Sequence, residues 1–151
     1  MPPPAVLRNR SLVVLLLMAA AVAGLAGYTF YDAEGLSYLG DDPKACANCH
    51  IMRGHFDDWN RSSHHAVASC NDCHTPEPFI PHWAVKAWDG FKHSFAFTTG
   101  FFHEPIRITA LDRRIATANC VRCHGDLTAR MAVDPRGGES DCVRCHRSPG
   151  H

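Results

Sequence analysis

CANCHIM, residues 46–52, contains two cysteines that are separated by two residues and followed directly by a histidine. C-x-x-C-H is the attachment sequence of c-type haem, in which both sulfurs bond the porphyrin and the imidazole lies beneath the iron. The spacing recurs and uses all eight cysteines of the chain, as Cys46/Cys49, Cys70/Cys73, Cys120/Cys123 and Cys142/Cys145. The repetition predicts four covalently bound c-type haems.

Disulfides and zinc sites are the other common uses of clustered cysteines. Four disulfides would suit a short exported chain. Two four-sulfur zinc sites could form if the first motif joined the second and the third joined the fourth. Neither use explains why a histidine follows the second cysteine of every pair, as His50, His74, His124 and His146 do. These histidines favour haem over both alternatives.

The length of the chain limits the core that it can build. Its 151 residues suit one domain, and about 120 of them lie outside the long apolar segment, or roughly 30 for each haem. We therefore expect the haems to form the core and the apoprotein to be unstable. The formal net charge of +0 gives no sign of nucleic-acid binding, which requires a basic surface.

Residues 11–31 form the long apolar segment and carry no charged side chain. About twenty helical residues, rising about 1.5 Å each, span the roughly 30 Å of a membrane's hydrocarbon core. Arg8 and Arg10 precede the segment, and positive residues stay on the cytoplasmic side. We therefore expect three parts: a cytoplasmic N-terminus at 1–10, a single-pass anchor in the inner membrane at 11–31, and a periplasmic tetrahaem domain at 32–151.

A cleaved signal peptide is the alternative for this segment. The basic start and the small residues of 19–26 suit a signal peptidase, but the segment exceeds the usual signal core of about 7–15 residues. Tyr28, Phe30 and Tyr31 stand at its outer end, as aromatic residues do where a membrane helix meets the headgroups. These features favour a retained anchor. Cleavage would instead leave a soluble periplasmic tetrahaem carrier.

The periplasmic part is predicted to be mainly α, with short helices, long loops and two di-haem halves. The first two motifs start 24 residues apart, the last two 22 residues apart, and the second and third 50 residues apart. This spacing groups the motifs in two pairs. A helix is expected from after Pro105 to Cys120, and a loop at 126–141, where Pro135 and two glycines interrupt the chain.

A longer helix is predicted over residues 82–97, after a proline-broken loop at 75–81. Apolar side chains recur at helical spacing on one face, at Ala84, Trp88, Phe91 and Phe95. A polar row of Lys86, Asp89 and His93 follows another face. The helix thus combines an apolar face with ionisable groups that could do acid–base chemistry.

Each motif histidine can serve as one axial ligand of an iron, and low-spin electron-transfer haems need a second ligand. Other histidines are available for this role: His55, His64, His65, His82, His93, His103 and His151. Some of them must be ligands, and the others are surface or hydrogen-bonded histidines. In the first motif Met52 follows His50 by two residues, and a methionine ligand raises the potential of a haem. Met52 either binds this iron or packs against the porphyrin.

An N-terminal anchor, four C-x-x-C-H motifs in a two-plus-two spacing, and C-x-x-C-H-x-M in the first motif occur together here. The combination resembles the NapC/NirT family of membrane-anchored tetrahaem quinol dehydrogenases, and within it the small subunits of cytochrome c nitrite reductase. The resemblance covers nearly the whole chain. It implies that the chain oxidises menaquinol and passes electrons to a large catalytic multihaem subunit, which reduces nitrite to ammonia. The alternative within the family is a hub that serves several periplasmic reductases.

The resemblance also implies a set of axial ligands. Met52, and not the motif histidine His50, would bind the first iron. The family segment W-x-x-S-x-H matches residues 59–64, which implies that His64 completes haem 4. The last residue, His151, matches the ligand of haem 2, so a terminal residue that would otherwise count as a frayed end is expected to bind iron.

Haem 3 and the quinol site follow from the same resemblance. Residues 125–145 contain no histidine, and the resemblance implies that a lysine of the catalytic partner completes haem 3. Quinol oxidation releases protons to nearby carboxylate, amine or imidazole groups. Lys86 matches the family lysine of the quinol site, and either Asp89 or His93 fills the place of its acidic partner. Without the resemblance, the same row is a solvated helix face with an ion pair at i, i+3 spacing.

Overall fold

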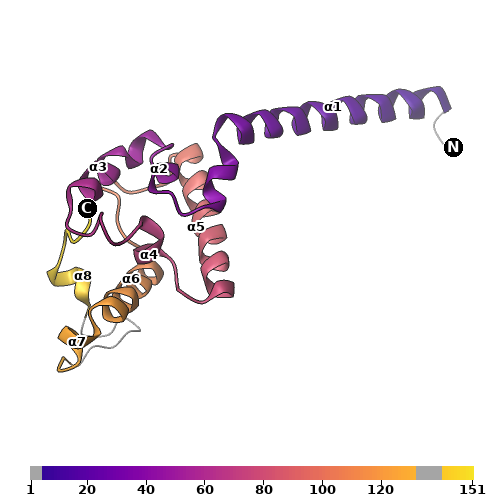
Figure 1. Ribbon diagram of the computed structural model, residues 1–151. Helices are drawn as coiled ribbons and strands as arrows, with labels where there is room; N and C mark the ends of the chain where they lie inside the picture. The colour runs from indigo at the N-terminus through magenta and orange to yellow at the C-terminus, as the bar shows by residue number, and fades with distance from the viewer. Residues whose placement is uncertain (1–4, 132–140) are drawn as a thin grey trace.

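The computed structural model describes residues 5–131 and 141–151, and every regular element assigned in them is a helix. Figure 1 shows a long N-terminal helix, α1 (Ala5–Asp32), that projects from a domain of shorter helices. The mainly α prediction is therefore confirmed. The later elements are η1 (Gly35–Leu39, a 3-10 helix), α2 (Pro43–Cys46), η2 (His50–Met52, a 3-10 helix), α3 (Arg53–Arg61), α4 (Cys70–His74), α5 (Phe79–Thr99), α6 (Ala110–Cys123), α7 (Gly125–Thr128) and α8 (Cys142–Cys145).

α1 contains the predicted anchor segment, residues 11–31. The part of α1 that could cross a membrane is Asn9–Asp32, 24 residues with a mean hydropathy of 2.2, and its most apolar window is not buried against the described chain. The helix stands clear of the domain in Figure 1. A helix that is apolar on all sides, with no protein surface covering it, is consistent with a membrane anchor.

The helices that carry the motifs pack against one another in chain order. α2 ends at the first cysteine of the first motif, α4 holds the second motif, α6 ends in the third, and α8 holds the fourth. α2 contacts α4, α4 contacts α6, and α6 contacts α8. The motifs therefore form a continuous row that begins next to η1, the element that leads out of α1.

Side chains contribute little to the core of this domain. In the described part of the chain, the buried apolar residues are Ala45, Ile115 and Ala116, and the buried polar residues are Thr75, Asp112, Thr117 and Asn119. A domain of this length normally buries much more apolar surface. The small core fits the expectation that covalently attached haem supplies most of the interior.

Two side chains of α6 join the second motif to the third. Asn119 Nδ2 donates hydrogen bonds to the carbonyl oxygens of Cys73 at 3.0 Å and Thr75 at 2.9 Å. Arg122 Nη2 donates to the carbonyl oxygen of Asp72 at 3.2 Å. The last carbonyls of a helix have no partners within that helix. α6 therefore supplies the partners that the end of α4 lacks, and it connects the two halves of the domain.

α5 is the predicted long helix, but it begins three residues earlier than residue 82. The prediction of a loop through residue 81 was wrong because Pro81 lies in the first turn, where a backbone N–H has no intrahelical partner to lose. At the other end Gly100 has φ 76°, in the left-handed region. Glycine adopts this conformation without strain, and it is a common way to end a helix.

α6 is the second expected helix, displaced toward the C-terminus. Thr109 Oγ1 accepts a hydrogen bond from Asp112 N at 3.3 Å and donates one to the Asp112 carboxylate. This cap makes the helix start after Thr109 and not directly after Pro105. α7 replaces the start of the loop predicted at 126–141, so that part of the prediction was wrong. Residues 132–140 of the predicted loop lie outside the described residues.

Replacing Asn119 with alanine should destabilise the domain. The substitution leaves the carbonyl oxygens of Cys73 and Thr75 without their donor, and unsatisfied buried acceptors cost about 2 kcal/mol. Guanidinium unfolding of the haem-loaded protein, followed by the haem absorption band, measures the change. Asn60→Ala, an exposed asparagine of α3, is the matched control and should leave the transition unchanged. Equal midpoints for the two variants would contradict this role of Asn119.

Candidate functional site

The cysteines of the four motifs share one arrangement. In each pair the first cysteine is half-buried and the second is exposed, and none of the eight forms a disulfide. The second, third and fourth motifs are helical from the first cysteine to the second, in α4, the end of α6 and α8. Helical residues three apart lie on the same side of the helix. Both sulfurs of such a motif can therefore reach one porphyrin, so the residues present fit covalent haem.

The first cysteines of neighbouring motifs lie in contact. A hydrogen bond from the Cys70 thiol lowers the pKa of Cys46 to about 7, and the same bond, followed by burial, raises the pKa of Cys70. Cys120 and Cys142 form the corresponding pair, and burial together with the Cys142 thiol raises the pKa of Cys120 to about 11. The first cysteines thus lie close together within each of these two pairs, and α4 and α6 bring the second motif next to the third as well.

The last residue of the chain lies beside the second motif. His151 Nε2 is 3.5 Å from His74 Nε2, and the two rings are stacked with their centroids 5.8 Å apart. Imidazoles on opposite sides of one metal ion have their nitrogens about 4 Å apart, twice a metal–nitrogen bond of about 2.0 Å. Burial lowers the pKa of both imidazoles, and the neutral ring is the form that binds a metal. This pair suits a shared iron.

The loop between α3 and α4 is closed by hydrogen bonds from the predicted W-x-x-S-x-H segment. Trp59 Nε1 donates to the carbonyl oxygen of Ala68 at 3.0 Å. Ser62 Oγ accepts from the backbone N–H of His64 at 3.2 Å. The tryptophan and serine thus determine the path of the backbone around His64, which explains why these residue types accompany the histidine.

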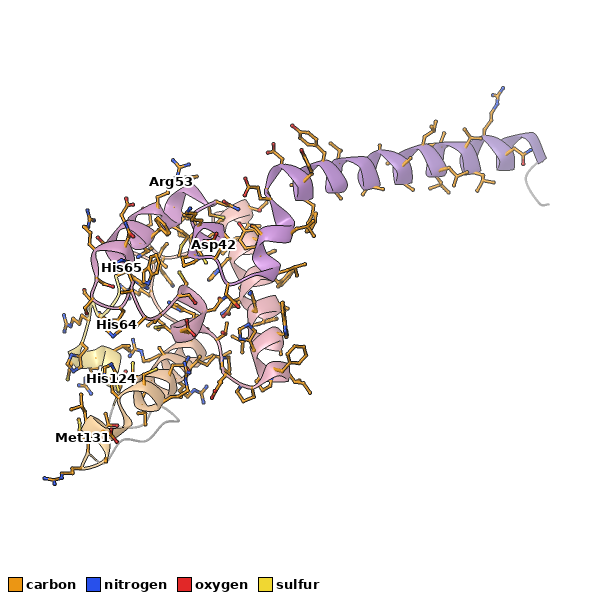
Figure 2. All side chains as sticks on the ribbon, viewed as in Figure 1. Asp42, Arg53, His64, His65, His124 and Met131 are labelled. Atoms are coloured by element: carbon orange, nitrogen blue, oxygen red, sulfur yellow. The ribbon has the colours of Figure 1, made fainter. Side chains whose placement is uncertain are left out.

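His64 and His65 have different surroundings although they are adjacent. His64 Nδ1 is 2.7 Å from the carbonyl oxygen of Pro149, three residues after the fourth motif, and a bond at Nδ1 leaves Nε2 free for a metal. The His64 ring also lies 6.1 Å from that of His124, beside it in Figure 2. His65 is exposed and packs its ring against Trp59 instead. His64 is therefore the member of the pair that lies near the motifs.

The first motif departs from the helical form of the other three. α2 ends at Cys46, Cys49 has an extended backbone with φ −79° and ψ 117°, and η2 then starts a separate turn. His50 is exposed, whereas Met52 is half-buried. The break changes the position of His50 relative to its cysteines, and it leaves Met52 the more enclosed of the two possible ligands.

Lys86 connects α5 to the segment that follows α1. Its Nζ donates to the carbonyl oxygen of Gly40 at 2.6 Å and to Asp41 Oδ1 at 3.2 Å. Its positive charge also helps to lower the pKa of Cys46 in the first motif. None of these contacts involves Asp89. The alternative of a solvated face with an ion pair between Lys86 and Asp89 is therefore wrong.

Asp89 and His93, the other members of the polar row, lie near the second motif. Asp89 pairs with Lys92 at 2.8 Å, and Lys92 also reaches Asp112 of α6 at 3.5 Å. Burial lowers the pKa of His74, Asp112 and Asp89 oppose that shift, and His93 adds to it. The polar row thus divides between two places: Lys86 lies by the first motif, while Asp89 and His93 lie within electrostatic range of His74.

A polar hollow of about 200 Å³ lies beside Asp41, and sequence reasoning did not predict it. Its ionisable lining residues are Asp41, Asp72, Glu77, His82 and Arg122. His82 Nδ1 is 2.9 Å from Thr75 Oγ1, and its Nε2 is 4.0 Å from Asp41 Oδ1. Hydrogen bonds from Asn71 and then Lys86 lower the pKa of Asp41. Residues from separate elements meet here, so no spacing in the sequence indicates the hollow.

Comparisons with known proteins agree with the motif pattern. The chain is 38% identical over 126 residues to the cytochrome c-type protein NrfH of Wolinella succinogenes, a match that covers 82% of this chain and 71% of that protein. It is 30% identical over 117 residues to the cytochrome c nitrite reductase subunit NrfH of Nitratidesulfovibrio vulgaris, covering 78% of this chain and 72% of that one.

A solved structure and a family extend the likeness over most of the chain. The structure is a chain of the cytochrome c nitrite reductase NrfHA complex bound to the HQNO inhibitor, with a TM-score of 0.63 and 30% identity, over 89% of this chain and 87% of that one. The family is the NapC/NirT cytochrome c family, N-terminal region, matched over residues 7–151. With nearly its whole length matched, this chain belongs to the NapC/NirT family of cytochromes c.

Proposed function

We propose that this chain is the membrane-anchored tetrahaem subunit that oxidises menaquinol and delivers electrons to a periplasmic multihaem nitrite reductase, which forms ammonia. The observation that carries the proposal is the match over 89% of the chain to a NrfHA complex with bound HQNO. The row of motif helices from α2 to α8 supports it, because electron transfer needs closely spaced carriers. The chain itself performs no chemistry on nitrite.

The eight cysteines would hold four c-type haems, which supply one-electron transfer when bound. We assign His74 and His151 to haem 2 on the basis of their facing Nε2 atoms. His64 completes haem 4 with the motif's own histidine, His146, which is supported by the contact of His64 with the tail that follows that motif. His124 would hold haem 3 together with a lysine of the catalytic subunit.

The first motif would be the site of quinol oxidation. Met52 would hold the first iron in place of His50, which is consistent with the lower exposure of Met52 and with the break between α2 and η2. Lys86 donates a hydrogen bond to a quinol oxygen, and protons pass to nearby acid–base groups. Asp41, which accepts a hydrogen bond from Lys86 Nζ at 3.2 Å, is one such group. Asp89 and His93, farther along α5 toward the second motif, are the other candidate groups.

The haem domain would lie on the periplasmic side of the inner membrane. α1 anchors the chain there by a single pass. Arg10, at the far end of α1 from the domain, supports a cytoplasmic N-terminus because positive residues flank a membrane helix on the cytoplasmic side. The domain then lies in the compartment where a periplasmic reductase can dock.

The proposed function predicts that the full-length chain, isolated from membranes, co-purifies with a larger multihaem subunit and that HQNO inhibits menaquinol-dependent nitrite reduction by the complex. Lys86→Leu should lower that rate by about 100-fold or more, the usual contribution of a positioned acid–base group, with haem content unchanged. Lys44→Leu removes the same charge from an exposed site and is the matched control. Isolation of the chain alone from active membranes would contradict the partner, and unaltered kinetics in Lys86→Leu would contradict its role.

Replacing each of the two candidate ligands, Met52 and His50, tests which of them binds the first iron. Met52→Ala should change the spectrum and the potential of one haem, since a thioether ligand raises the potential, and it should slow quinol oxidation. His50→Ala should preserve both. Redox titration and magnetic circular dichroism of the purified protein measure the difference. The opposite ranking of the two variants would assign His50 as the ligand.

His151→Ala should convert one low-spin haem to the high-spin form, because the second motif's iron loses one of its two imidazoles. Electron paramagnetic resonance of the oxidised protein detects the conversion. His103→Ala, at an exposed histidine outside the motif helices, should leave the spectrum unchanged. A wild-type spectrum in His151→Ala would remove the terminal histidine from the ligand set.

A further inference from the structure

The charged and apolar side chains of α5 are arranged in the opposite way to those of an ordinary helix on the surface of a soluble domain. Its charged side chains lie against the domain: Lys86 is 15% exposed and Asp89 is 17% exposed. Its large apolar side chains lie outside: Trp88 is 53% exposed, Phe91 62% and Phe95 54%. A helix in water normally places its apolar side chains on the core side and its charges outside.

The outer face of α5, defined here as Ile80, Ala84, Trp88, Phe91 and Phe95, is continuous over most of the helix. These residues follow i, i+4, i+8, i+11 and i+15, a spacing that keeps them on one side. The rings of Trp88 and Phe91 and those of Phe91 and Phe95 have centroids 6.2 Å apart. No charged residue interrupts the face. An exposed apolar strip of this length indicates a contact surface.

The haem-bearing motifs do not cover this face. Lys86, on the opposite side of α5, contacts Asp41 in the connector, and Lys92, on the flank of the helix, contacts Asp112 of α6. Asp89, on the same side as Lys86, lies within electrostatic range of His74 in the second motif. The side of α5 that faces the motifs is therefore the charged side. The outer face points away from every motif helix that these contacts reach.

The position of α5 in the domain brings its outer face near the end of α1. In Figure 1, α5 runs across the direction of α1 and forms the side of the domain from which α1 departs. The hydrogen bond from Lys86 to Gly40 ties the middle of α5 to a residue only eight positions after the end of α1. With η1 rising about 2 Å per residue, that connection spans at most about 20 Å. Trp88 thus lies close to the point where α1 would leave the bilayer.

We propose that the outer face of α5 lies in the lipid headgroup region and seats the haem domain on the membrane. This inference rests on the proposed role of α1 as a membrane anchor. A helix perpendicular to a spanning helix lies in the plane of the bilayer, where apolar and aromatic side chains enter the boundary between headgroups and acyl chains. Tryptophan is favoured at that depth. Leu36 and Leu39 of η1, both exposed, extend the apolar surface between α1 and α5.

Photolabelling with lipid tests the proposal on the full-length, haem-loaded chain. The protein is placed in vesicles of phosphatidylethanolamine and phosphatidylglycerol that contain a phospholipid with a diazirine near its glycerol backbone. After illumination, mass spectrometry maps the labelled peptides. Peptides of α1 and α5 should both carry label, whereas α7 should not, although its Leu127 is equally exposed to solvent. Trp88→Glu combined with Phe91→Glu should abolish labelling of α5 and preserve that of α1 and the haem spectrum.

The outcomes separate this proposal from the proposed anchor. Label on α1 without label on α5 in the wild-type chain overturns the contact of α5 with lipid and leaves the anchor intact. Absence of label from both shows that the anchor itself is wrong. If α5 is unlabelled in vesicles but the bound catalytic subunit protects it from hydrogen exchange, the outer face docks a protein and the proposal fails. Leu127→Glu, the matched control, should change none of these results.

Discussion

The main constraint on this domain is that it buries very few of its own apolar side chains. Three apolar side chains are buried in the described residues, and hydrophobic packing on that scale cannot hold a domain of this size together. Polar bonds between short helices hold the described chain together, and haem attached at the cysteines would supply the rest of the core. Asn119 shows the principle, since one amide satisfies two carbonyl oxygens at the end of α4. At this interface polar bonds join the second motif to the third.

α5 links the membrane side of the molecule to its redox centres. Its inner side holds Lys86 on the connector that follows α1, and it holds Lys92 on α6. The helix is therefore tied at two places, near the first motif and near the second. Under the proposed function, ionisable groups on one side of this helix would serve a quinol that comes from the lipid, while the other side presents an apolar surface.

Much of the candidate site was predictable because c-type haem attachment needs a local motif. Short spacings in the sequence predict the cysteines and histidines of each motif and the pairing of the motifs. Helical periodicity predicts α5. The start of α5 was misplaced because Pro81 reads as a helix breaker although the first turn tolerates it. The approach of His82 to Asp41 was not predicted because the two residues come from a helix and a connector, with side chains 4.0 Å apart and no shared spacing in the sequence.

Three features could be predicted from residues that lie close together in the chain. They are the haem-attachment motifs, the apolar helix at the N-terminus and the two faces of α5. Only the tertiary structure decided which face of α5 turns outward, that His151 returns to His74, and that Lys86 binds the connector and not Asp89. These contacts join residues tens of positions apart. Their formation depends on how the helices pack, which local residue patterns do not specify.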